Sequence, residues 1–215
     1  MTRIKICGVM LPDDAASVAA SGVDLIGLNF WPKSKRYVTP ERAPIVAAAA
    51  RASGSARLVG VFVDPDVEDI LEITGRVELD VIQLHGDEDP ELCKKISAAL
   101  YRPVWKALPI ASSRDVIKLE VWPTEALLLD APTPGRGGAG AKFDWNVARE
   151  ARERHPTRNF VLAGGLDATN VAAAIALVEP WAVDVASGVE AAPGIKDPAK
   201  VAAFVAAVRA ADQSR

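Results

Sequence analysis

Two reactive side chains, Lys5 and Cys7, stand two residues apart at the end of the short aliphatic run Ile4–Cys7. Alternate residues of a strand share a face, so we expect the ammonium group and the thiol to lie side by side. A neighbouring positive charge favours the thiolate, which can act as a base or a nucleophile. A buried structural cysteine is the alternative. A lysine seldom enters a core without a purpose, however, so the pair favours a catalytic role for Cys7.

A carboxyl group follows three consecutive leucines, where the run Ala126–Asp130 ends. An apolar environment disfavours the charged form of a carboxyl and so keeps a proton available for donation. The alternative is an aspartate that caps a loop or pairs with a lysine. We interpret Asp130 as a general acid.

Several segments carry groups that bind anions. Arg36 lies in a basic and aromatic stretch, residues 30–38, and arginine can hold a carboxylate through two parallel hydrogen bonds. A solvated charged loop is the alternative there. Gly164-Gly165 and Ser187-Gly188 end two consecutive apolar runs, and glycines let backbone amides approach a phosphate closely. Turn glycines are the alternative reading of each pair.

Two further features are less specific. The glycine cluster at 137–140 predicts a loop that covers a ligand. His85 ends another apolar run, where it either faces the ligand or forms a structural hydrogen bond.

Short β-rich runs that alternate with alanine-rich helical stretches would position these groups. Eight such units in 215 residues average about 27 residues each, which demands a parallel α/β sheet. An open doubly wound sheet also fits, but no GxGxxG follows the first run, so we predict a closed (β/α)8 TIM barrel. We expect one catalytic domain over residues 1–215, with its site at the carboxyl ends of the strands. The predicted strands are Ile4–Cys7, Leu25–Asn29, Leu58–Val63, Val81–Leu84, Val104–Lys106, Ala126–Asp130, Phe160–Leu162 and Val183–Val185.

Helices are expected between these strands. Thr39 is a predicted N-cap of a helix over Pro40–Arg51, and Asp197 is a predicted N-cap of a helix over Pro198–Ala211. A third helix is expected over Thr169–Val178. The remaining helical stretches are residues 13–21, 66–74, 88–99, 113–120 and 143–154.

The composition restricts the partners. With 25 basic and 28 acidic residues, the formal net charge is −3, and we expect neither a nucleic-acid nor a membrane partner. Two cysteines and two histidines, without CxxC or HExxH spacing, predict no disulfide framework and no metal site. The N-terminus lacks the apolar region of a signal peptide, so we expect a cytoplasmic protein. The sequence leaves monomer and homodimer open.

Seven motifs taken together resemble the phosphoribosylanthranilate isomerase family. Each is weak alone, but their order, each at the end of a predicted strand, is specific. They extend over nearly the whole chain: KICG at 5–8, SKRYV at 34–38, QLHGDE at 83–88, LLLDA at 127–131, GGAG and FDW within 137–145, LAGGL at 162–166 and VDVASGVE at 183–190.

The resemblance implies a barrel enzyme that acts on a small phosphorylated substrate without a cofactor or a metal. The family catalyses an Amadori rearrangement of N-(5-phosphoribosyl)anthranilate to 1-(2-carboxyphenylamino)-1-deoxyribulose 5-phosphate in tryptophan biosynthesis. By its motifs, Cys7 would be the general base, Asp130 the general acid, and Arg36 the residue that holds the anthranilate carboxylate.

The same motifs place the remaining site residues. Lys5, His85 and Asp184 are expected to contact the substrate, in roles that the motifs leave undefined. The phosphate would be held by backbone amides of the last two strand ends, at Gly164, Gly165, Ala186, Ser187 and Gly188.

The sequence departs from the family pattern at two positions. Ala139 stands where the family commonly has threonine, and Ala186 stands where it commonly has serine. The first affects the ordering of the glycine loop. The second matters little if backbone amides bind the phosphate.

Related barrels fit less well. Indole-glycerol-phosphate synthase has a longer region before the first strand, and the dual-substrate isomerase of histidine and tryptophan synthesis has an aspartate where Cys7 stands. A non-catalytic sugar-phosphate sensor would keep the phosphate loops and have no need of Cys7 and Asp130.

Overall fold

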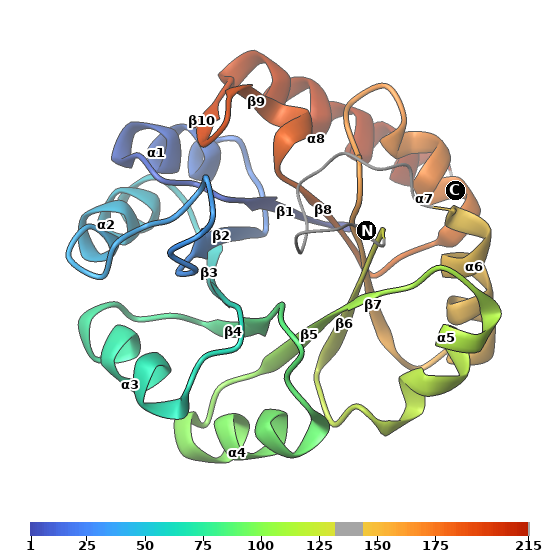
Figure 1. Cartoon of the computed structure of the whole chain (residues 1–215). Coiled ribbons are helices and arrows are strands. Elements are labelled where there is room, and N and C mark those ends of the chain that lie inside the picture. Colours follow the sequence, from blue (N-terminus) through green and yellow to red (C-terminus); the bar gives the residue numbers. More distant parts are fainter. Residues whose placement is uncertain (132–143, 215) are drawn as a thin grey trace.

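The computed structural model describes residues 1–131 and 144–214. Its parallel strands close into a barrel in the order β1 to β8, surrounded by helices (Figure 1). The predicted (β/α)8 barrel is confirmed. The strands are β1 (Arg3–Cys7), β2 (Leu25–Asn29), β3 (Arg57–Phe62), β4 (Val81–Leu84), β5 (Val104–Pro109), β6 (Ala126–Asp130), β7 (Asn159–Leu162) and β8 (Ala182–Val185).

The predicted starts of α2 and α7 are wrong. Helix α2 begins at Ala43 and not at Pro40, because a helix from Pro40 would place Pro44 in its interior, where proline breaks the hydrogen-bond ladder. Helix α7 begins at Val171, since Asp167 accepts the N–H of Thr169 in a turn before it. The helices are α1 (Pro12–Ala20), α2 (Ala43–Ser53), α3 (Val67–Arg76), α4 (Pro90–Leu100), α5 (Ser113–Ile117), α6 (Trp145–Arg154), α7 (Val171–Val178) and α8 (Pro198–Gln213).

The predicted cap of α8 is confirmed. The Asp197 carboxylate accepts the backbone N–H groups of Ala199 and Lys200, and Pro198 occupies the first turn. An N-cap carboxylate satisfies amides that have no partner within the helix.

Alternation along each strand separates two cores. In β1, Ile4 and Ile6 face outward and pack beneath the helices. Cys7 lies against the inner core, which fills the barrel with residues such as Leu128 and Trp105. The inward-facing positions therefore carry both the barrel packing and the candidate chemistry.

A short hairpin follows β8 and precedes α8. A 3-10 turn, η2 (Ser187–Val189), leads into β9 (Glu190–Ala192), which pairs antiparallel with β10 (Ile195–Lys196). Its turn uses Gly194, whose φ of +82° favours glycine. In Figure 1 the hairpin lies beside α1.

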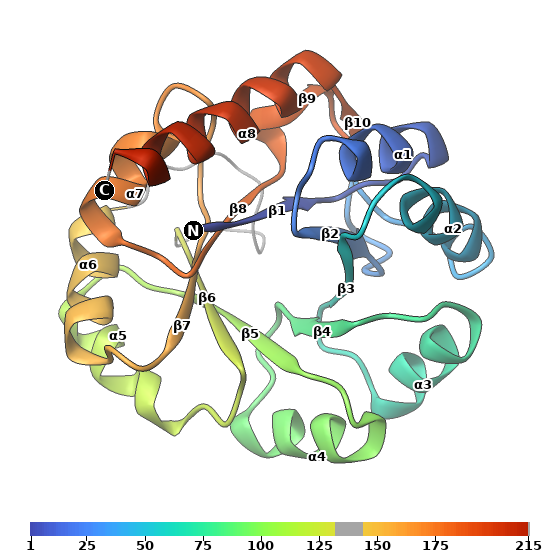
Figure 2. The same cartoon turned by 180° about the vertical axis from the view of Figure 1, so that it is seen from behind.

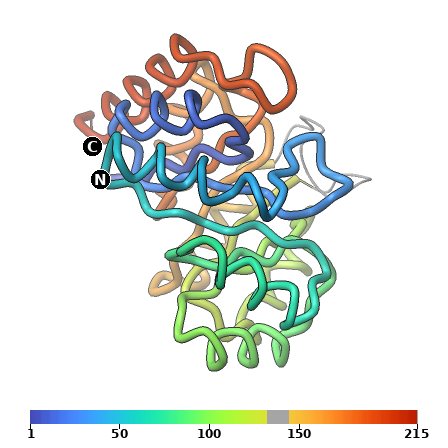
Figure 3. Tube along the Cα trace, turned by 90° about the vertical axis from the view of Figure 1, so that its left-hand side faces the viewer, coloured from blue at the N-terminus to red at the C-terminus, as the bar shows by residue number. Residues whose placement is uncertain are grey.

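The two termini lie together at one end of the barrel, whereas the loop after β2 projects from the other end (Figure 3). Seen from behind, α8 runs past the start of β1 (Figure 2). There the Asp212 carboxylate accepts the backbone N–H and the hydroxyl of Thr2, both at 2.7 Å. The last helix thus fastens the first strand.

Candidate active site

Strand β1 brings Lys5 and Cys7 to the inner face, as predicted. The Lys5 side chain is fully buried, and its Nζ lies 2.9 Å from Oδ1 of Asp184, which is its register partner on β8. The register partner of Cys7 on β2 is Gly27. A Cβ at Gly27 would lie 2.8 Å from the Cys7 sulfur and 3.3 Å from the Lys5 Nζ, so this glycine provides the space for both groups.

The surroundings of Cys7 act on its pKa in two directions. Burial raises the pKa of the Cys7 thiol, and the nearby Lys5 ammonium opposes this shift without cancelling it. Burial also acts to lower the pKa of Lys5, but the charge of Asp184 and its hydrogen bond outweigh it, so the net pKa of Lys5 is raised. The Lys5 charge is thus shared with Asp184, and the raised pKa of Cys7 favours its neutral thiol form.

Asp130 ends β6, where its Oδ1 accepts the backbone N–H of Ala131 at 2.8 Å. Its other oxygen, Oδ2, lies 3.6 Å from Nε2 of His85, which follows β4. The fully buried Gln83 places its side-chain nitrogen 3.3 Å from Nδ1 of His85. A Gln83 N–H donated to Nδ1 leaves the imidazole proton on Nε2, directed toward Asp130.

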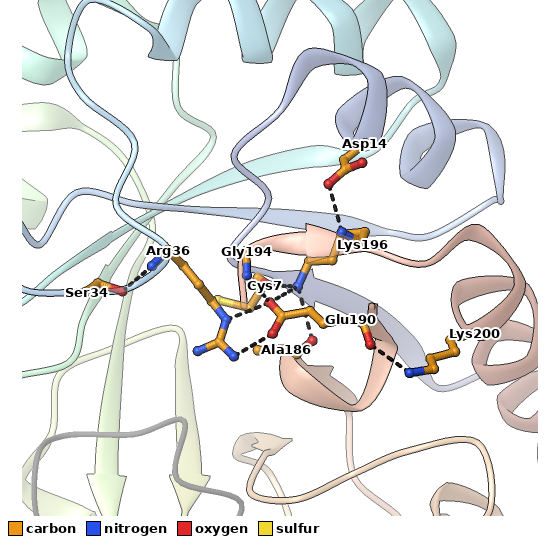
Figure 4. A network of polar contacts seen from close by, with 9 residues as sticks. All are labelled: Cys7, Asp14, Ser34, Arg36, Ala186, Glu190, Gly194, Lys196 and Lys200. Carbon is orange, nitrogen blue, oxygen red and sulfur yellow. Dashed lines mark hydrogen bonds and ion pairs between the residues drawn. The ribbon is translucent and has the colours of Figure 1, made fainter. Parts of the chain in front are cut away.

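Arg36 is held by a carboxylate of the protein itself. Its Nε and Nη2 donate to the two carboxylate oxygens of Glu190, each at 2.7 Å (Figure 4). Gly8, with φ of +73°, allows this approach, because a Cβ there would collide with the Arg36 side chain. The arginine is therefore fixed and not a freely solvated loop residue.

The loops after β7 and β8 meet each other. Gly164 and Gly165 have φ of +86° and +66°, a conformation that favours glycine. Gly188 lies against the carbonyl of Leu166, and a Cβ there would collide with that oxygen. The Asn170 side chain donates to the Gly165 carbonyl at 2.9 Å and so ties the β7 loop to the start of α7. The glycines predicted to bind phosphate thus come together in one region.

Sequence reasoning missed two buried ion pairs. Lys196 lies 2.9 Å from Glu190, and Lys106 lies 3.0 Å from Glu88. All four side chains are buried. Glu88 and Glu190 stand in motifs that the sequence singled out. Lys106 lies in the predicted strand Val104–Lys106, but Lys196 lies in the short hairpin after β8, which the sequence did not predict. The glycine cluster at 137–140, including Ala139, lies outside the described residues.

The described ranges hold no group of three or more histidine, cysteine, aspartate or glutamate side chains arranged to bind a metal ion.

Across residues 1–131 and 144–214, none of the helices is both long and apolar enough to cross a membrane.

The fold and this arrangement define a class. A thiol, a carboxyl and two glycine loops meet at the carboxyl ends of a closed parallel barrel, which is where (β/α)8 enzymes carry their active sites. A family model described as N-(5'phosphoribosyl)anthranilate (PRA) isomerase matches residues 4–207. The chain belongs to that family, and it is an isomerase.

Individual relatives agree. N-(5'-phosphoribosyl)anthranilate isomerase of Ralstonia nicotianae is 42% identical over 98% of this chain and 94% of its own length. The solved isomerase of Thermotoga maritima has a TM-score of 0.86 at 41% identity, over 98% of this chain and all of its own. Another solved isomerase holds reduced 1-(o-carboxyphenylamino)-1-deoxyribulose 5-phosphate. It has a TM-score of 0.83 at 39% identity, over 98% of this chain and all of its own.

Proposed function

We propose that this chain converts N-(5-phosphoribosyl)anthranilate to 1-(2-carboxyphenylamino)-1-deoxyribulose 5-phosphate, with Cys7 as base and Asp130 as acid. The observation that carries the proposal is the placement of these two groups. They stand at the carboxyl ends of β1 and β6, which two strands separate on one side of the barrel and four on the other. The related isomerase that holds a reduced, phosphorylated carboxyphenylamino sugar supports the substrate class.

The reaction needs one proton donated and one removed. Asp130 gives a proton to the ribose ring oxygen, the ring opens, and the anthranilate nitrogen forms a protonated Schiff base with C1. Cys7, once ionised, takes the proton from C2 and leaves an enolamine. Its C2 hydroxyl then loses a proton as C1 gains one, which yields the ketose. General acid and general base catalysis each contribute typically about 10²–10⁴-fold.

The anchors would supply the positioning. Arg36 uses its Nε–Nη2 edge for Glu190, so the anthranilate carboxylate would meet the other edge. Backbone amides at Gly164, Gly165 and the β8 loop would hold the phosphate. Holding both ends of the substrate fixes the reacting carbon between acid and base.

Other site predictions remain proposals. Lys5 has its Nζ bonded to Asp184, so we propose that this pair shapes the floor beneath Cys7. His85 would contact the substrate beside Asp130. No cofactor or metal enters the proposed mechanism.

The setting of the enzyme is also proposed. Cys7 and Cys93 are free thiols, and a catalytic thiol must stay reduced, which supports a cytoplasmic location. We propose that this chain is either a monomer or a homodimer. A solved isomerase of Thermotoga maritima is described as dimeric, and monomers of it have been generated. We propose a single catalytic domain and no nucleic-acid or membrane partner.

The test is a fluorescence assay with freshly generated N-(5-phosphoribosyl)anthranilate. We expect rapid loss of anthranilate fluorescence with the native chain. Cys7→Ser should keep the fold and lose about 10²–10⁴-fold in kcat, as removal of a general base does. Native turnover in Cys7→Ser would remove Cys7 as the base. If the native chain bound the substrate without turnover, it would instead be a non-catalytic sensor of a sugar phosphate.

A further inference from the structure

The carboxylate of Glu190 is buried at the mouth of the barrel and makes four interactions there (Figure 4). Oε1 accepts from Arg36 Nε at 2.7 Å, from Lys196 Nζ at 2.9 Å and from the Gly194 backbone at 3.2 Å. Oε2 accepts from Arg36 Nη2 at 2.7 Å. A buried carboxylate with this many donors is fixed in one orientation, and it fixes its partners in turn.

Lys196 extends this network to two other parts of the site. Its Nζ donates to the carbonyl oxygens of Cys7 at 2.7 Å and Ala186 at 3.1 Å. Its backbone N–H donates to Asp14 on α1 at 2.8 Å. The Glu190–Lys196 pair therefore connects the strand end that bears the base, the β8 loop and the residue predicted to bind the substrate carboxylate.

Two cationic side chains, Arg36 and Lys196, pair with the single carboxylate of Glu190. Burial acts to raise the pKa of Glu190, but the hydrogen bond from Arg36 and the charge of Lys196 outweigh it, so the net pKa is lowered and Glu190 is ionised. Burial lowers the pKa of Lys196, and Glu190 opposes that shift. Two cations face one carboxylate. Without Lys196, Glu190 would neutralise Arg36 and cancel its attraction for an anion.

The network leaves one edge of the Arg36 guanidinium available for a ligand. A guanidinium has two edges that can each hold a carboxylate with two parallel N–H groups. Glu190 occupies the Nε–Nη2 edge, which leaves the Nη1–Nη2 edge. We propose that Glu190, with Lys196 as its counter-ion, is a positioning residue that presents the free edge of Arg36 to the carboxylate of the aromatic substrate. This inference rests on the proposed function.

The role predicts selectivity for the carboxylate, so the test compares two ligands. One is reduced 1-(2-carboxyphenylamino)-1-deoxyribulose 5-phosphate, and the other is the same molecule without the carboxyl group. Calorimetry gives the ratio of their dissociation constants. Glu190→Gln places an amide N–H against an arginine N–H and removes the charge. We expect it to reduce the native preference for the carboxylated ligand about tenfold, as loss of a charge-assisted hydrogen bond does.

Glu88→Gln is the matched control. Glu88 is also buried, is paired with Lys106 at 3.0 Å, and accepts the backbone N–H groups of Asp64 and Gly86. These partners, unlike those of Glu190, do not include Arg36, so Glu88 holds a different loop. A merely structural loss should weaken both ligands equally, so we expect Glu88→Gln to keep the native ratio.

The outcomes distinguish a failure of the positioning role of Glu190 from a failure of the proposed isomerase function. In an Arg36→Ala background, Glu190→Gln should leave the ratio unchanged, because both act through one contact. A native ratio in Glu190→Gln, or equal weakening of both ligands, would overturn the positioning role while the isomerase function stands. A native chain that binds neither ligand and shows no turnover would instead count against the proposed function. If Glu190→Gln does not fold, Glu190→Asp keeps the charge, shortens its reach, and gives the same readout.

Discussion

Lys5 and Asp184 set the properties of the thiol that they adjoin. A lysine alone would favour the thiolate at Cys7. Asp184 lies 2.9 Å from the Lys5 Nζ, and its negative charge offsets part of the effect of the lysine on the thiol. Burial therefore dominates, and the pKa of Cys7 is raised. The same pair keeps a charged lysine inside the barrel, since an unpaired buried ammonium would be costly.

The raised pKa of Cys7 predicts a pH dependence. A thiol with a raised pKa is neutral at pH 7, so its thiolate fraction should rise about tenfold per pH unit below that pKa. We expect the rate of alkylation of Cys7 by iodoacetamide, followed by mass spectrometry, to increase in this way between about pH 7 and 9, because this range lies below the raised pKa of Cys7. The buried Cys93, whose pKa is raised to about 11, is the internal control and should stay unmodified. Fast alkylation of Cys7 that is independent of pH in this range would show a resting thiolate.

At the scale of the elements, the sequence predicted the repeating units and missed the pieces between them. Short β-branched runs predicted every barrel strand within two or three residues, because buried parallel strands have a strong hydrophobic pattern. The hairpin of β9 and β10 has three and two residues in its strands, too few for any periodicity. Glu190 and Lys196 lie in that hairpin, so the contact of Glu190 with Arg36 could not be predicted either.

The contact between the β7 and β8 loops predicts the effect of Gly188→Ala. The new Cβ would collide with the Leu166 carbonyl oxygen and lie 3.0 Å from a Val185 methyl group. Since the obstacle is backbone, the loops must move apart, which costs about 1–3 kcal/mol in crowded sites. We expect KM to rise about tenfold or more, because the phosphate amides would lose their arrangement. Steady-state kinetics measure this.

Gly75→Ala provides the control for that substitution. Gly75 lies near the end of α3, and a Cβ there has nothing within 4 Å. Alanine should stabilise the helix by about 0.5–1 kcal/mol and leave KM unchanged. An unchanged KM in Gly188→Ala as well would argue against a phosphate site between the two loops.

At the scale of the whole molecule, stability and chemistry occupy opposite ends of the barrel. The termini meet at one end, where α8 fastens β1 through Thr2 and Asp212, and the loop that bears Arg36 lies at the other (Figure 3). Arg209 adds a hydrogen bond to the Thr2 carbonyl at 2.9 Å. In (β/α)8 barrels the N-terminal face of the strands serves stability, so we infer that these contacts support the fold.

Asp212→Ala should therefore reduce stability without affecting catalysis. Thr2 is 3% exposed, so its N–H and hydroxyl would lose their acceptor, at a cost of about 1–3 kcal/mol. Denaturant unfolding measures that loss, and kcat and KM should stay native. Burial acts to raise the pKa of Asp212, but its hydrogen bonds with Thr2 outweigh it, so the net pKa is lowered. A lowered pKa gives stability that is present above the unfolded-state pKa and lost as pH falls. The deficit of the variant should consequently shrink in acid, and a deficit that stayed constant would mean that the carboxylate charge is not what fastens β1.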